Sequence, residues 1–76
     1  AEIEAAVALA KFGQYEKAVE EFKRLIKENK MPLLAAKNLL RCHLELSTRE
    51  AAVDQLKSWA SKRKPFSKSE LNYLKN

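Results

Sequence analysis

The sequence repeats with a step of 34 residues, and this period limits what the chain can fold into more than any other feature. The equivalent pairs are Ala18 and Ala52, Val19 and Val53, Phe22 and Leu56, and Leu25 and Trp59. In both copies an alanine precedes a large apolar residue by four positions, which places the two side chains on one face of a helix. A repeat of this length is one helical hairpin that buries its apolar face against its neighbour, so the period predicts an all-α array of antiparallel hairpins.

Length and composition exclude several classes of protein. A chain of 76 residues with 46% hydrophobic and 33% charged residues is one small folded domain, too apolar for intrinsic disorder. No apolar run approaches the roughly 20 residues that cross a membrane, and the acidic start lacks the layout of a signal peptide. The single cysteine, Cys42, cannot form an internal disulfide, which favours a cytoplasmic location. Since residue 1 is alanine and the sequence stops within an expected helix, we expect a piece of a longer protein.

Helix start and stop signals divide the chain into five expected helices. Their approximate ranges are 1–12, 15–28, 32–45, 47–62 and 67 onward. Gly13 is expected to end the first helix in the left-handed conformation, and Pro32 suits the first turn of the third. The spacings Ser47–Glu50 and Ser67–Glu70 are capping-box patterns, in which each side chain binds a free backbone N–H at a helix start.

Apolar residues at helical spacing predict which side chains face the core. The expected inner stripes are Ala18, Val19, Phe22, Leu25 and Ile26 in the second helix, Leu33, Ala36, Leu39, Leu40 and Leu44 in the third, and Ala52, Val53, Leu56, Trp59 and Ala60 in the fourth. Trp59 stands at the position equivalent to Leu25 of the first copy, and we expect it to pack on the final helix. His43 is expected to pack between helices, with Cys42 on a different face.

Residues 13–22 closely resemble the turn and second helix of a tetratricopeptide repeat. The matching positions are Gly13, Tyr15, Ala18 and Phe22, and the second copy keeps Ala52 and Leu56. Ser47 and Arg49 replace the glycine and the tyrosine there, so the second copy is diverged. The resemblance implies an α-α superhelix, with repeat one at about 1–31, repeat two at about 32–65 and a terminal helix at about 66–76.

The same resemblance implies a scaffold that binds proteins without being an enzyme. Its concave groove would be lined by the first helix of each repeat, and the candidate groove residues are Lys37, Asn38, Arg41, Lys68 and Asn72. Ammonium, guanidinium and amide groups there would bind an acidic or C-terminal segment of a partner. Family members that clamp a terminal carboxylate use a lysine and an asparagine in one repeat, an asparagine in the next, and a lysine and an arginine in the third. The sequence can be aligned with these repeats in two ways, and neither alignment matches all the positions, so the full clamp is absent. Self-association through the terminal helix is a further expectation.

The charge distribution leaves an alternative function open. The net charge is +5, and the segment from Lys57 to Lys68 carries five basic residues and no acidic residue. Lys57, Lys62, Arg63 and Lys64 are either a solvated helix end or a basic patch for nucleic acid or an anionic membrane surface. Neither a catalytic constellation nor a cofactor is predicted, because His43 and Cys42 are the only histidine and cysteine and adjacent helical residues do not converge on one metal ion.

Overall fold

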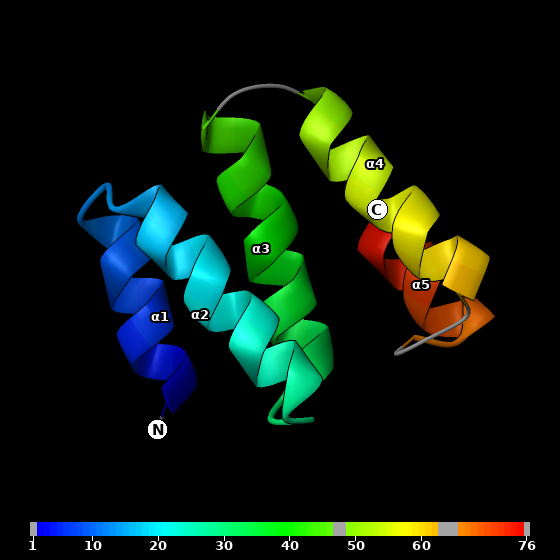
Figure 1. Cartoon of the computed structure of the whole chain (residues 1–76), viewed down its shortest axis with the longest axis horizontal. Coiled ribbons are helices and arrows are strands. Elements are labelled where there is room, and N and C mark those ends of the chain that lie inside the picture. Colours follow the sequence, from blue (N-terminus) through cyan, green and yellow to red (C-terminus); the bar gives the residue numbers. More distant parts are fainter. Residues whose placement is uncertain (1, 47–48, 63–65, 76) are drawn as a thin grey trace.

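The computed structural model describes residues 2–46, 49–62 and 66–75, and all the regular structure in these ranges is α-helical. The helices are α1 (Glu2–Lys11), α2 (Tyr15–Lys27), α3 (Pro32–Leu46), α4 (Arg49–Lys62) and α5 (Lys68–Lys75). Successive helices run in alternating directions (Figure 1). The prediction of an all-α chain with five helices is therefore confirmed over the described residues.

Helix α3 lies in the middle of the molecule and contacts each of the other four helices (Figure 1). Helix α2 packs against α1 and α3, and the contact between α2 and α3 is the most extensive of all. Among the described residues α2 makes no contact with α4 or with α5. The second pair, α4 and α5, is therefore held to the first three helices through α3 alone.

Small side chains are completely buried on both α2 and α3. Ala18 on α2 and Ala35 and Ala36 on α3 are 0% exposed, as are Phe22 and Leu39 beside them. A methyl group allows two helix backbones to approach closely, whereas a larger side chain would separate them and open the packed core. Complete burial of Ala18 is expected of a small residue at which two helices pack closely.

Two helices end in the same hydrogen-bonded motif. Gly13 has a φ of 81°, its N–H donates to the carbonyl of Ala10, and the N–H of Gln14 donates to that of Leu9, as the glycine predicts. Asn29, with a φ of 57°, closes α2 in the same way, a stop that the sequence analysis did not identify. Asparagine tolerates the left-handed region better than most residues.

The second capping box forms as predicted. The backbone N–H of Ser67 donates to Glu70 Oε1 at 2.8 Å, and the N–H of Glu70 donates to Ser67 Oγ at 3.2 Å. The box begins α5 right after Phe66, which is almost fully buried and meets Trp59 edge to face at a centroid distance of 5.0 Å. The core position predicted for Trp59 is confirmed. Ser47 of the other capping pattern lies outside the described residues.

Three residues predicted to face the core are instead exposed: Leu44 on α3, and Val53 and Ala60 on α4. Helix α4 packs only on α3 and α5, and α5 has eight residues, so less helix surface covers α4 than covers α2. The buried stripe of α4 is correspondingly narrow. On α3 the buried residue near the C-terminal end is Cys42, which the sequence analysis had not placed in the core.

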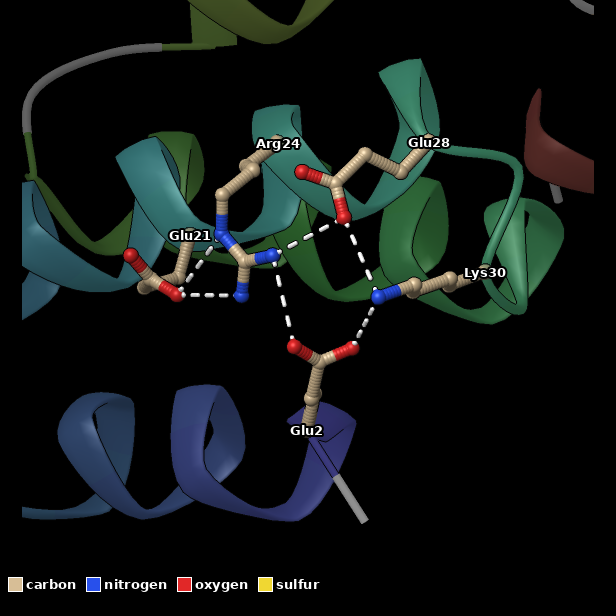
Figure 2. A network of polar contacts seen from close by, with 5 residues as sticks. All are labelled: Glu2, Glu21, Arg24, Glu28 and Lys30. Carbon is tan, nitrogen blue, oxygen red and sulfur yellow. Dashed lines mark hydrogen bonds and ion pairs between the residues drawn. The ribbon is translucent and has the colours of Figure 1, made fainter.

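A network of five charged side chains joins the start of α1 to the end of α2 (Figure 2). The Arg24 guanidinium lies 2.8 Å from Glu21, 3.1 Å from Glu28 and 3.4 Å from Glu2. The Lys30 ammonium lies 2.8 Å from Glu2 and 3.2 Å from Glu28. The hydrogen bond from Lys30 holds the pKa of Glu2 and of Glu28 below the ordinary glutamate value, with Arg24 acting in the same direction.

We predict that Ala18→Leu destabilises the fold. Three extra carbons at a fully buried helix interface force the helices apart or the side chain off its rotamer, which typically costs about 1–3 kcal/mol. Urea denaturation measures the loss as a lower midpoint. Ala5→Leu, at an exposed position of α1, is the matched control and should leave the midpoint nearly unchanged. Equal effects of the two substitutions would contradict the proposed spacing role.

We predict that Glu2→Gln lowers the melting temperature at neutral pH and that this deficit disappears in acid. The folded pKa of Glu2 is lowered, so its stabilisation is present above the ordinary glutamate pKa of about 4.3 and is lost as the pH falls through the folded pKa. High salt should shrink the deficit as well. Melting curves measured across pH test this, with Glu20→Gln on an exposed part of α2 as control. A deficit that persists in acid would show that the ion pairs are not its source.

Candidate functional site

One face of α3 points away from the core and carries a stripe of mixed chemistry. Leu34, Asn38, Arg41 and Glu45 follow one another at steps of four, three and four residues, the spacing of a single helical face. The opposite face of α3 packs into the core through its alanines and leucines. Helices α1 and α5 each contact α3, and residues of both border the stripe. The stripe is therefore an accessible strip with a helix on either side.

Between α1 and α3 the surface is hollowed into a cleft of about 210 Å³, called here the α1–α3 cleft. Its lining residues are Val7, Ala10, Lys11, Tyr15, Asn38, Arg41, Cys42 and Glu45. Lys11 and Arg41 come from opposite helices, and Glu45 is the one acidic residue of the lining. Cys42 is only 2% exposed, and this burial raises the pKa of its thiol. The cleft thus combines apolar walls with two cations.

A second hollow, of about 430 Å³, lies between the start of α3 and α5 and is called here the α3–α5 cleft. It is lined by Met31, Pro32, Leu33, Leu34, Glu70 and Tyr73. Three of these apolar side chains face solvent: Met31 is 55% exposed, Leu34 43% and Tyr73 53%. Met31 has a φ of 48°, and its carbonyl accepts the hydrogen bond from Ala35 that starts α3.

Two contacts connect the clefts along α3. The ammonium of Lys37 lies over the ring of Tyr73, 4.8 Å from its centroid, which is within the range of a cation–π interaction. The side-chain amide of Asn38 donates to the carbonyl of Leu34 at 2.9 Å. Lys37 therefore joins α3 to α5, and Asn38 lies one turn beyond the leucine of the α3–α5 cleft.

The structure brings some of the predicted groove residues together and separates others. Asn38 and Arg41 line the α1–α3 cleft, and Lys37 meets Tyr73. Lys68 lines a different pocket, together with Ala60, Phe66, Ser67 and Leu71, and Asn72 is exposed on α5. Helix α5 places the aromatic side chain of Tyr73 beside α3, and the sequence pattern predicts no binding role for this residue. Leu34 lies four residues before Asn38 and seven before Arg41, and this helical spacing is the sequence signal that places Leu34 on the same face as the predicted groove residues.

The remaining predicted residues have separate surroundings. Lys57 and Lys62 are exposed on α4, whereas Arg63 and Lys64 lie outside the described residues. Of the repeat positions, Tyr15 is half-buried in the α1–α3 cleft, Phe22 and Ala52 are buried and Leu56 is half-buried. His43 is also half-buried, and this burial lowers its pKa, with the charge of Lys23 acting in the same direction.

Metal-binding clusters and membrane-spanning helices are both absent from the described ranges. Their His, Cys, Asp and Glu side chains form no group of three or more that is placed to hold a metal ion. None of the helices in these ranges combines the length and the apolar character needed to cross a membrane.

Comparison with known proteins adds no family to these observations. No family model matches the chain, and neither a curated protein nor a solved structure matches it. The tetratricopeptide resemblance therefore stays a prediction from the sequence.

We predict that Cys42 reacts with a maleimide at least about tenfold more slowly in the folded chain than in urea. The thiolate is the reacting form, and burial both shields the sulfur and raises the thiol pKa. Ser61→Cys in a Cys42→Ser background places a thiol at an exposed position of α4 and should react rapidly in the native state. Rapid labelling of native Cys42 would mean that α1 and α3 separate readily at this cleft.

Proposed function

We propose that the chain is a non-enzymatic protein-interaction module of tetratricopeptide-like hairpins, which binds a segment of a partner protein on the surface formed by α1, α3 and α5. The contact pattern supports this arrangement, because α3 meets both α1 and α5 while α2 is not in contact with α4 in the part of the chain that the structure describes. Hairpins stacked in this way place their first helices side by side on one surface.

The stripe on α3, with a cleft on each side, is the observation that supports the proposal most. The α1–α3 cleft, at about 210 Å³, is smaller than the roughly 300–1,000 Å³ typical of small-molecule sites, and the α3–α5 cleft, at about 430 Å³, lies near the lower end of that range. Two separate clefts along one helical face suit two side chains of a single extended segment better than they suit one compact ligand. A scaffold that presents such a surface functions as an adaptor.

Charge favours an acidic segment. Arg24 and Lys30 are paired with carboxylates in the network on α1 and α2. Lys11, Lys37 and Arg41, by contrast, form no ion pair with a carboxylate of the described residues. Three cations near the stripe would attract and bind the carboxylates of a partner through charge-assisted hydrogen bonds.

We predict that peptides selected by the chain lose affinity for the double variant Lys37→Glu/Arg41→Glu. Random dodecapeptides displayed on phage are selected on the wild-type chain, and the affinities of synthetic copies are measured by fluorescence polarisation. Reversing two charges should weaken binding by tenfold or more, about 1.4 kcal/mol for each factor of ten. Lys23→Glu/Lys27→Glu, which reverses two exposed charges on α2, is the matched control. Equal affinity for both double variants would exclude this surface as the binding site.

Binding of nucleic acid or an anionic membrane surface through the 57–68 segment stays a prediction. Lys57 and Lys62 are exposed in the structure, as such binding requires. An oligonucleotide filter-binding titration over salt concentration separates this alternative from peptide binding, because phosphate contacts weaken steeply as salt rises.

A further inference from the structure

We infer that the partner segment is extended and carries one large apolar residue and one acidic residue, with about two residues between them. The apolar side chain occupies the α3–α5 cleft, and the carboxylate binds Arg41 and Lys11 at the α1–α3 cleft. This inference rests on the proposed function and names the chemistry of its ligand. Three features support it: the exposed apolar lining of one cleft, the charges of the other and the distance between them.

The α3–α5 cleft is an open surface hollow with a mostly apolar lining. Met31, Leu34 and Tyr73 come from two segments that are distant in sequence, and all three are partly exposed to water around one hollow of about 430 Å³. That volume accommodates a leucine or phenylalanine side chain, and filling it would remove apolar surface from water on both partners. Glu70 at the same cleft disfavours an acidic residue there.

The α1–α3 cleft has the opposite preference. Lys11 on α1 and Arg41 on α3 both line it, and neither is paired with Glu45, its one acidic residue, or with another carboxylate of the described residues. A carboxylate between them would gain charge-assisted hydrogen bonds, and a basic side chain would meet two cations. Lys37, which lies over Tyr73, adds a third positive charge between the clefts.

The helix sets the spacing between the two positions. Leu34 and Arg41 are seven residues apart on the same face of α3, which corresponds to a rise of about 10.5 Å. An extended chain advances about 3.3 Å per residue, so about three residues of the partner cover this distance. The expected pattern is apolar-x-x-acidic or its reverse, because the spacing along α3 does not depend on the direction in which the segment runs.

The test compares peptide pools selected on the wild-type chain and on Arg41→Glu, with random dodecapeptides on phage as the probe. The wild-type pool should be enriched in the apolar-x-x-acidic spacing in one direction. The Arg41→Glu pool should keep the apolar residue and replace the acidic residue by lysine or arginine. Leu34→Ser should weaken the best wild-type peptide by about tenfold. Leu44→Ser, at another exposed leucine of α3 that lines neither cleft, should not.

The outcomes separate this inference from the proposed function. The selected peptides could bind the wild-type chain and lose affinity for Lys37→Glu/Arg41→Glu, yet show another spacing between their apolar and acidic residues. That result overturns the inference and leaves the proposed function standing. If the peptides selected on Arg41→Glu still prefer an acidic residue, the inference is likewise overturned and the proposed function stands. Failure to select any peptide contradicts both. If circular dichroism shows that Arg41→Glu does not fold, Arg41→Gln replaces it in the selection. The peptides selected on Arg41→Gln should show no preference for an acidic residue. A persistent acidic preference overturns the inference.

Discussion

The close approach of α2 and α3 is the constraint on which the rest of the structure depends. Ala18 on α2 and Ala35 and Ala36 on α3 are completely buried, so the packed core has no room for a larger side chain at these positions, and α3 turns its small residues inward. The opposite face, with Leu34 and Arg41, is thereby directed to solvent. The alanines that stabilise the core thus also determine which residues are available to a partner.

The ion pairs of the first hairpin affect the surface as well as the stability. Individual exposed ion pairs contribute little, but five charges in one network place the start of α1 against the end of α2 (Figure 2). The network also occupies the carboxylates of Glu2, Glu21 and Glu28. Glu45 is the one acidic residue that lines the α1–α3 cleft, and it forms no ion pair with Lys11 or Arg41. The two cations of the cleft are therefore open to a carboxylate of a partner.

Helices α4 and α5 contribute fewer buried residues to the core than the first three helices do. Helix α4 buries Ala52 and Trp59, and the edge-to-face contact with Phe66 connects it to the start of α5. Helix α5 is short, and its capping box and its two buried leucines position it against its neighbours. That placement leaves Tyr73 beside the start of α3, where it completes the α3–α5 cleft. The apolar half of the proposed site therefore depends on the smallest helix.

The sequence by itself determined the helices, most of their ends and the buried stripe of α2, because apolar spacing, Gly13, Pro32 and the capping box act locally. Tertiary structure decided the rest. Leu44 and Val53 fit an apolar stripe as well as Leu39 does, but they are exposed because none of the described helices covers them. The pairing of Tyr73 with Lys37, and the separation of Lys68 from Arg41, follow from the way α5 is turned against α3. That rotation results from packing between helices distant in sequence, which local spacing does not encode.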